Sequence, residues 1–207
     1  MDMISSSSNY TKLCGTMAAA PVYSHSSRGQ QFYTFPLEIL RLSGNSDTVN
    51  VIVRPEMLSQ VEAEEYSRIC VTGQVRTFNN RRGEGAKLVI SIFAKELCLC
   101  DEEDCNIVQL RGTLCKEPKL RSTPMGRDIC DLMLAVNRRY GRSDYLPCIC
   151  WGARARQAAF WTVGTQLALE GRIQSRKYIK LTDEGAVEKT AYEISVTEAE
   201  EINGDEE

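Results

Sequence analysis

Residues 106–114, NIVQLRGTL, repeat residues 9–17, NYTKLCGTM, at an offset of 97 positions (106 − 9 = 97). Asn, Leu and Gly keep their places in both stretches. The same offset relates residues further along the chain: Pro21, Gly29, Leu37 and Arg41 reappear as Pro118, Gly126, Leu134 and Arg138. A period this long excludes solenoid repeats, whose units run to about 20–50 residues. The sequence therefore predicts two complete small domains in tandem.

Alternating apolar and polar residues predict five short strands in the second copy. In the first strand, Val108, Leu110, Gly112 and Leu114 share one face. The same period of two predicts four later strands, at Asp131–Asn137, Tyr145–Trp151, Gln166–Gln174 and Tyr192–Val196. Between the third and fourth strands, Ala153–Trp161 is rich in Ala, Arg and Gln and predicts a helix. Five strands with a helix after the third is the order of an OB-fold barrel.

The first copy has the same order of elements. Its predicted strands are Thr11–Thr16, Phe32–Arg41, Thr48–Val53, Arg68–Val75 and Lys87–Ala94, with a helix near Glu56–Ala63. Four consecutive acidic residues place a linker near Leu99–Cys105. The predicted fold class is therefore all-β, with two tandem OB-fold five-stranded barrels that each carry one short helix. We assign the first barrel to residues 1–99, the second to residues 106–202 and an acidic tail to residues 203–207.

The composition predicts a soluble, cytoplasmic protein. Its 207 residues, 43% of them hydrophobic, suit two domains of roughly 100 residues with a core each. No run of 18 apolar residues occurs, and residues 1–10 lack the apolar middle of a secretory signal. Nine cysteines without an export signal favour reduced thiols over a disulfide framework. We expect no membrane partner.

The net charge of −3 conceals an uneven distribution. Residues 106–197 hold fifteen Lys and Arg against nine Asp and Glu, a net charge of +6. Residues 198–207 hold six acidic residues and no basic one, and residues 1–105 hold ten basic and thirteen acidic residues. The second copy therefore carries the basic surface, which is the electrostatic requirement for binding nucleic acid.

Four motifs follow one another in the second copy: GTLCKEPKLRSTPMG at residues 112–126, LAVNRRY at 134–140, ICWG at 149–152 and LEGRIQSRKY at 169–178. Through them, residues 106–202 resemble the bacterial single-stranded DNA-binding protein family almost from end to end. The first copy resembles the family mainly through its alignment to the second. The resemblance implies sequence-independent binding of single-stranded DNA, which coats and protects exposed strands in DNA replication, recombination or repair at the nucleoid.

The resemblance also implies base-stacking positions at four aromatic residues, Tyr140, Tyr145, Trp151 and Tyr178. Nucleobases stack on exposed aromatic rings at about 1–3 kcal/mol each. Strand alternation supports part of this assignment, because Tyr145, Pro147, Ile149 and Trp151 share one face of their strand. The other face, with Leu146, Cys148 and Cys150, is then left for the barrel interior. The alternative is that these aromatic residues belong to the core.

Basic residues flank the aromatic residues in sequence, as expected of a groove that binds a single strand. The candidate phosphate contacts are Arg111, Lys116, Lys119, Arg121, Arg127, Arg138, Arg139, Arg142, Arg172, Arg176 and Lys177. Each of them taken alone is equally consistent with an ordinary solvated surface. Trp161, near the end of the predicted helix, is expected to be packed.

The first copy lacks aromatic residues at all four stacking positions, where it has Ser43, Thr48, Arg54 and Asn80. Its own Tyr33 and Phe35 lie on an alternating strand and are expected in the core. The first barrel is therefore predicted to be a degenerate OB domain that serves as a scaffold for assembly. Five arginines could add phosphate contacts: Arg41, Arg54, Arg76, Arg81 and Arg82.

We expect no cofactor, no metal ion and no enzymatic activity. Cys98, Cys100 and Cys105 resemble part of a zinc site, but a fourth ligand is not evident, and the only histidine, His25, is far away in sequence. Other cysteines are interpreted as small apolar residues, namely Cys14, Cys70, Cys115 and Cys130.

Members of the family recruit replication and repair enzymes through an acidic tip that ends in Pro-Phe, whereas this sequence ends in Gly204-Asp-Glu-Glu207. Recruitment through such a tail is therefore not expected. The resemblance implies four OB barrels acting together, which two copies of this chain supply as a homodimer. The alternative function is a primosomal-type OB interaction module that binds partner proteins at replication forks. The retained aromatic residues favour single-stranded DNA as the partner.

Overall fold

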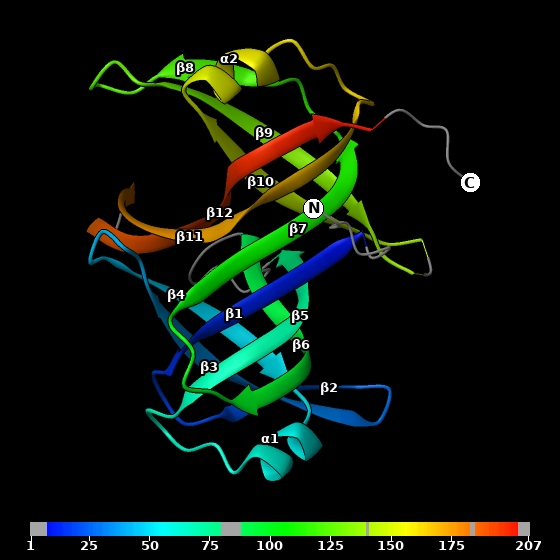
Figure 1. Cartoon of the computed structure of the whole chain (residues 1–207), viewed down its shortest axis with the longest axis vertical. Coiled ribbons are helices and arrows are strands. Elements are labelled where there is room, and N and C mark those ends of the chain that lie inside the picture. Colours follow the sequence, from blue (N-terminus) through cyan, green and yellow to red (C-terminus); the bar gives the residue numbers. More distant parts are fainter. Residues whose placement is uncertain (1–7, 80–87, 140, 183–184, 203–207) are drawn as a thin grey trace. The chain divides into compact units, whose positions relative to one another are not determined.

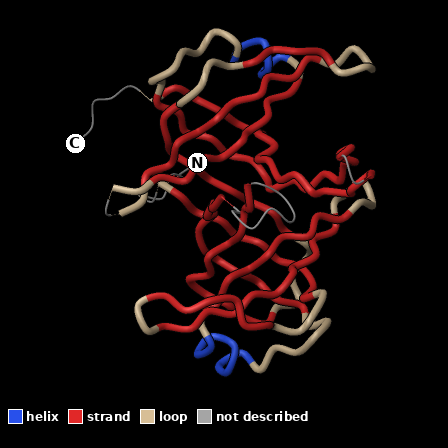
Figure 2. The backbone as a smooth tube through the Cα atoms, turned by 180° about the vertical axis from the view of Figure 1, so that it is seen from behind, coloured by secondary structure: helices blue, strands red, loops and turns tan. Residues whose placement is uncertain are grey.

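The computed structural model describes residues 8–79, 88–139, 141–182 and 185–202 (Figure 1). The first half contains β1 (Asn9–Met17), β2 (Val22–Ser27), β3 (Gln30–Leu40), β4 (Ser46–Val53), α1 (Pro55–Val61), β5 (Arg68–Asn79) and β6 (Leu88–Leu99). The second half contains β7 (Cys105–Leu114), β8 (Lys119–Ser122), β9 (Asp128–Asn137), β10 (Ser143–Trp151), α2 (Ala153–Ala158), β11 (Gln166–Thr182) and β12 (Gly185–Glu201). Strands make up most of the described chain, as Figure 2 shows.

The strands of the first half close into a barrel. They pair in the order β3, β4, β6, β5 and β1, and β1 then pairs back onto β3 through Thr16 opposite Glu38 and Met17 opposite Leu37. β4 and β6 run parallel, whereas the pairs β3–β4, β6–β5 and β5–β1 are antiparallel. β2 extends the sheet beyond β3. Helix α1 lies between β4 and β5 in the chain, so the first half has the predicted OB order.

The second half repeats this arrangement. Its strands pair in the order β9, β10, β12, β11 and β7, and β7 returns to β9 through Thr113 opposite Ala135 and Leu114 opposite Leu134. β10 and β12 are the parallel neighbours, and β8 extends the sheet beyond β9. The prediction of two tandem OB-fold barrels with one short helix each is confirmed. The added strands β2 and β8 were not predicted.

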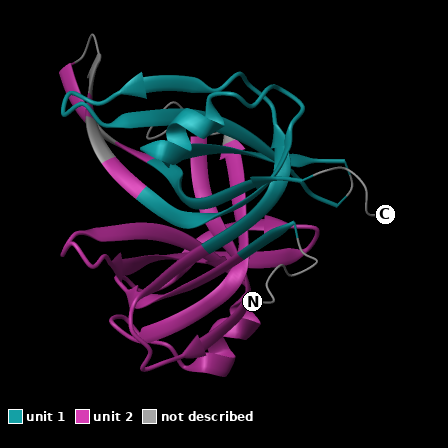
Figure 3. Cartoon of the chain, turned by 45° about the horizontal axis from the view of Figure 1, so that its top comes forward, with its two compact units in different colours: residues 1–10, 108–174, 192–207 teal, residues 11–107, 175–191 magenta. Residues whose placement is uncertain are grey.

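Two compact units divide the chain (Figure 3). Unit 1 contains residues 1–10, 108–174 and 192–207, and unit 2 contains residues 11–107 and 175–191. The central part of the β11–β12 segment therefore belongs to the unit that contains the first barrel. No helix among the residues that the structure describes is long and apolar enough to cross a membrane.

Alternate strand residues fill each barrel interior. In unit 2 the fully buried side chains include Leu13, Phe35, Leu37, Ile69 and Ile92; in unit 1 they include Leu110, Leu114, Leu134, Leu146 and Leu167. Tyr33, which was predicted to be in the core, is only partly buried. Phe32 is buried instead, because the burial pattern of β3 changes phase between Phe32 and Phe35.

Helix α2 ends at Ala158, three residues earlier than predicted. The amides of Phe160 and Trp161 donate to the carbonyls of Gln157 and Ala158, three residues back, so the last predicted turn is not α-helical. Trp161 is nevertheless 8% exposed, as expected of a packed residue.

Cys14 and Cys70 form a disulfide bond, which corrects their interpretation as reduced apolar residues. The two residues lie directly opposite each other on β1 and β5, although they are 56 positions apart in sequence. Among the seven free cysteines, Cys130, Cys148 and Cys150 are buried. Burial raises the pKa of the Cys148 thiol, and it raises that of Cys150 to about 12. These buried thiols are protonated at neutral pH.

A glycine lies where each barrel closes. A Cβ atom on Gly112 of β7 would lie 2.5 Å from the backbone oxygen of Ala135 and 2.9 Å from Cγ of Leu134. At Gly15, the equivalent residue of β1, it would lie 2.2 Å from the backbone oxygen of Glu38. A strand that leaves one neighbour to pair with another approaches the new backbone too closely for a side chain. The repeated glycine is therefore a condition of closure.

We expect Gly112→Ala to destabilise the protein by about 1–3 kcal/mol, because a methyl group would push β7 away from the backbone of β9. Urea denaturation measures this change. Lys119→Ala, on the exposed strand β8, is the matched control and should change the free energy of unfolding by less than about 0.5 kcal/mol. Equal stability of the two variants would show that closure does not require glycine.

Candidate nucleic-acid interface

The outer face of the β8–β9–β10 sheet carries the candidate site, and strand register defines its members. Tyr145 of β10 lies opposite Ala135 of β9, which in turn lies opposite Thr113 of β7. At the other end, Trp151 lies opposite Ile129, and Ile129 lies opposite Arg121 of β8. Paired residues project to the same side of a sheet. One face of unit 1 therefore holds both of these aromatic residues.

The two aromatic residues on this face are accessible. Tyr145 is 53% exposed and Trp151 is partly exposed. Pro147 and Ile149 lie between them on the same side of β10. Pro147 is partly exposed, whereas Ile149 is only 3% exposed. Leu146, Cys148 and Cys150 on the opposite side of β10 are buried as predicted.

The remaining aromatic candidates are not placed by the structure. Tyr140 lies outside the described residues. Tyr178 and Lys177 are part of β11, but their side chains are outside the described part of the chain. Of the first-copy residues considered above, Asn80, Arg81 and Arg82 are also not described.

Two of the candidate basic residues share the outer face with the aromatic residues. Lys119 lies opposite Asp131, and Arg121 binds the Asp131 carboxylate through its Nε at 2.6 Å and an Nη at 3.0 Å. Both partners are substantially exposed, so this ion pair contributes little to stability, and phosphate can compete for Arg121. Asp131 is a part of the face that the sequence did not single out.

The other candidate basic residues lie on several other elements. Lys116, Arg127, Arg139, Arg142 and Arg172 are exposed, and they lie in the loops next to β8, in the β9–β10 turn and on β11. Arg176 is exposed on the part of β11 that belongs to unit 2. Arg111 of β7 is partly buried, and within the described residues its Nε is buried without a hydrogen-bond partner.

Arg138 has a structural contact that the sequence reading missed. Its Nε donates to the carboxylate of Asp144 at 2.6 Å, and a second nitrogen also contacts this carboxylate, which is completely buried. The first barrel repeats the pair at the same offset, with Arg41 Nε 2.6 Å from Asp47. Both pairs join the two strands of the β-hairpin that precedes the helix. Arg138 is therefore a positioning residue next to the candidate face.

Asp47 shows how such a carboxylate stays charged. Burial would raise its pKa, but hydrogen bonds from the Arg41 guanidinium and from the backbone amide of Ser175 outweigh burial, and the pKa is lowered. The Ser175 hydroxyl adds a third donor at 3.1 Å. Ser175 belongs to the same unit as Asp47, so the acid connects the β11 segment of unit 2 to the first barrel.

The corresponding outer face of the first barrel has a different composition. Thr48 stands at the place of Tyr145, and the residue opposite it is Glu38 rather than Ala135. The next pair is Asn50 opposite Pro36. A carboxylate without an aromatic neighbour does not favour a nucleobase or a phosphate. The described face of this barrel therefore lacks the features that define the candidate site in unit 1.

The first barrel has aromatic residues elsewhere that sequence reasoning did not group. Tyr23 of β2, which is 56% exposed, meets Tyr33 edge-on with ring centroids 6.1 Å apart. His25 stacks on Phe32 at 5.0 Å. The alternation of β3 indicated a core position for Tyr33, and β2 was not predicted at all, so this cluster had no recognisable signal.

We expect Asp47→Asn to lower the free energy of unfolding by about 1–3 kcal/mol at neutral pH, because the buried Arg41 contact loses its charge. The pKa of Asp47 is lowered by folding, so its contribution is complete above the unfolded value of about 4 and is lost as pH falls through the folded pKa. The variant should therefore lose less stability than the parent between neutral and acid pH. Urea denaturation at a series of pH values measures the free energy of unfolding of both proteins, and Asp101→Asn, at an exposed residue, is the control. If the free energy of unfolding varied with pH in the same way for the parent and for Asp47→Asn, this prediction would be wrong.

Comparison with known proteins finds a family match over the second half of the chain. Residues 105–202 match the model of the Single-strand binding protein family. Single-stranded DNA-binding protein 2 of Listeria innocua is 39% identical over 80 residues, which cover 35% of this chain and 50% of that protein. Single-stranded DNA-binding protein A of Bacillus subtilis is 36% identical over 80 residues, which cover 35% of this chain and 46% of that protein. The chain thus spans about half the length of the curated relatives it matches.

The tandem arrangement has a counterpart among solved structures. The wild-type single-stranded DNA binding protein from Thermus aquaticus superposes with a TM-score of 0.76, covering 96% of this chain and 95% of that chain at 21% identity. At this identity the likeness establishes the fold of both barrels. The family model thus matches the second barrel, which carries the exposed aromatic face.

Proposed function

We propose that this protein binds single-stranded DNA without sequence preference, through the outer face of β8, β9 and β10 in the second barrel. The relatives over this segment are named single-stranded DNA-binding proteins. In such a role the protein coats and protects exposed strands during replication, recombination or repair. Binding alone accomplishes this, so we assign no catalytic residue.

The half-exposed ring of Tyr145 is the observation that carries the proposal. Its neighbours across the sheet, Ala135 and Thr113, are small, so they leave the space above the face open to a flat ring. A nucleobase stacked there removes apolar surface of both rings from water, and any of the four bases can do so. Trp151, six residues further along β10, provides a second position. Tyr140 and Tyr178 complete the proposed set.

Basic residues supply the second requirement for binding DNA, which is positive charge. Lys119 and Arg121 lie on the proposed face, and the remaining proposed phosphate contacts are Arg111, Lys116, Arg127, Arg138, Arg139, Arg142, Arg172, Arg176 and Lys177. Within this set Arg138 acts mainly through Asp144. Neutralising phosphates releases counterions, so binding should weaken as salt increases. Duplex DNA offers the same phosphates but hides its base faces, so we propose a preference for single strands.

We further propose that the first barrel serves assembly, and that two chains form a dimer with four OB barrels. Support comes from the contrast between the two outer faces, Glu38 and Thr48 in the first against Ala135 and Tyr145 in the second. A symmetric dimer is the commonest closed assembly. In it, one long strand could occupy two second-barrel faces. Light scattering tests the dimer: a particle of one chain mass at every concentration would overturn it.

Tyr145→Ala should weaken binding of oligo-dT by about 1–3 kcal/mol, which corresponds to roughly 5–150-fold in Kd. Fluorescence anisotropy of a labelled oligonucleotide measures this change. Thr48→Ala, the equivalent substitution in the first barrel, is the matched control and should leave Kd unchanged within about twofold. Thermal unfolding of both variants excludes a folding defect. Unchanged binding by a folded Tyr145→Ala protein would remove the proposed face.

A further inference from the structure

Cysteines that are distant in sequence converge in the first barrel. Cys14 of β1 and Cys70 of β5 lie opposite each other and are joined by the disulfide. The sulfur of Cys100, which follows β6, lies within 4.8 Å of both of their sulfurs. Cys14 and Cys70 are almost completely buried, whereas Cys100 is partly exposed. Three sulfurs therefore meet just below the surface, where a small ion can reach them.

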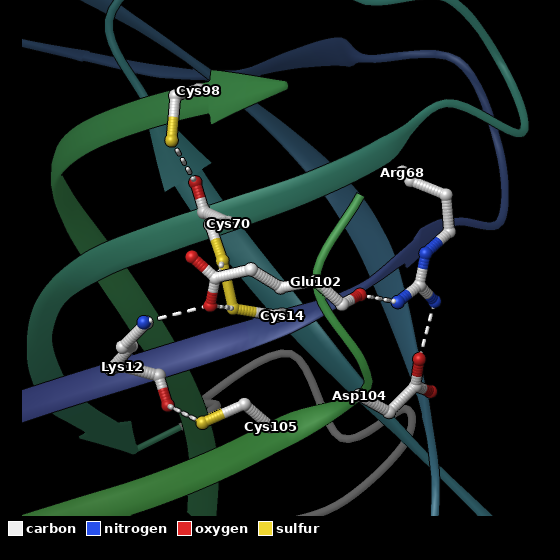
Figure 4. The surroundings of a disulfide bond; sticks show 8 residues. All are labelled: Lys12, Cys14, Arg68, Cys70, Cys98, Glu102, Asp104 and Cys105. Atoms are coloured by element: carbon white, nitrogen blue, oxygen red, sulfur yellow. Dashed lines mark hydrogen bonds and ion pairs between the residues drawn. A yellow bond between two sulfur atoms is a disulfide. The ribbon is translucent and has the colours of Figure 1, made fainter. Parts of the chain in front are cut away.

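The Glu102 carboxylate lies next to the two sulfurs of the disulfide (Figure 4). Oε2 of Glu102 is 3.7 Å from Sγ of Cys14 and 3.8 Å from Sγ of Cys70. Cys100 and Glu102 are only two positions apart in the segment that follows β6. The other two cysteines nearby are directed to backbone oxygens: Cys98 to that of Cys70 and Cys105 to that of Lys12.

We propose that, when the Cys14–Cys70 bond is reduced, the sulfurs of Cys14, Cys70 and Cys100 and the carboxylate of Glu102 bind one zinc ion. Thiolates with at most one oxygen ligand are a typical tetrahedral zinc set. Zn–S bonds of about 2.3 Å separate neighbouring sulfurs by about 3.8 Å. The Cys14 and Cys70 sulfurs must move apart to this spacing after reduction, and the Cys100 sulfur already lies within 4.8 Å of both. The expectation of no metal site considered ligands close in sequence, and these ligands are brought together by the barrel.

The surrounding charges suit such a site. Three thiolates and one carboxylate around Zn²⁺ have a net charge of −2, and two cations lie beside them. Lys12 Nζ is 2.9 Å from Glu102 Oε2, and Arg68 contacts both the backbone oxygen of Glu102 and the Asp104 carboxylate. These contacts also hold the Glu102 segment against the barrel. The site would therefore tie β1 and β5 to the segment that leaves β6.

The disulfide and the metal site exclude each other, because Cys14 and Cys70 cannot ligate zinc while their sulfurs are bonded together. Reduction breaks that bond with two electrons and two protons from a dithiol, which is itself oxidised to a disulfide. The three thiols then release their protons to solvent as zinc binds. The first barrel would thus bind metal only in its reduced state.

The test measures metal content in the full-length protein. Protein reduced with a phosphine, incubated with excess zinc and passed over a desalting column should retain about one zinc per chain. Protein with the disulfide intact should retain none. With Co²⁺ as the probe, the reduced protein should show the near-ultraviolet absorption of cobalt–thiolate bonds. Reduced, folded protein that retains no zinc, or oxidised protein that retains as much as reduced protein, would overturn the site.

Cys100→Ser distinguishes the metal site from the disulfide alone, because Cys100 takes no part in the disulfide. This substitution should weaken zinc binding by at least about 100-fold, more than is usual for a residue that only supports a ligand. Cys115→Ser, a partly exposed cysteine of the second barrel, is the control and should bind as the parent does. Circular dichroism monitors folding. Parent-like zinc affinity in Cys100→Ser would overturn the assignment even if the parent binds zinc.

Discussion

Each barrel can close only because the backbones of two strands approach each other closely, and the rest of the architecture depends on this contact. Gly112 lets β7 leave β11 and pair with β9, and Gly15 does the same for β1 and β3. Gly171 and Gly73 play a similar part on β11 and β5, where a Cβ atom would lie 2.4 Å from the Ser195 oxygen and 2.3 Å from the Phe93 oxygen. Closure separates an apolar interior from an outer face. The proposed DNA-binding face of the second barrel depends on that separation.

The same scaffold therefore carries two different surfaces. The buried pairs Arg41–Asp47 and Arg138–Asp144 occupy equivalent places and preserve the same hairpin in both barrels. On the outer face the fold does not restrict the residue type. Tyr145 and Ala135 of the second barrel are replaced there by Thr48 and Glu38 in the first. The proposed division of labour, with DNA on the second barrel and assembly on the first, follows from differences that do not disturb the core.

Sequence patterns predicted the barrels because closure and core both leave local signals: alternation in strands such as β7 and β9, and the glycine repeat. They missed β2 and β8, whose residues are all exposed and carry no apolar period. They also missed contacts that exist only after folding. Asp144 neutralises Arg138 across a hairpin, and Cys14 meets Cys70 and Cys100 through strand register. Alternation predicted the side of β10 on which Ile149 lies, but alternation does not specify what covers a side chain, and Ile149 is buried.

Tryptophan emission tests the central claim most directly, because the chain has two tryptophans with opposite predicted behaviour. Trp151 lies on the proposed face and Trp161 is packed. A Trp161→Phe variant, which retains Trp151, should be quenched by oligo-dT and much less by duplex DNA of equal length. A Trp151→Phe variant should respond to neither. Quenching of Trp161 alone, or equal quenching of Trp151 by duplex and single strand, would contradict the account.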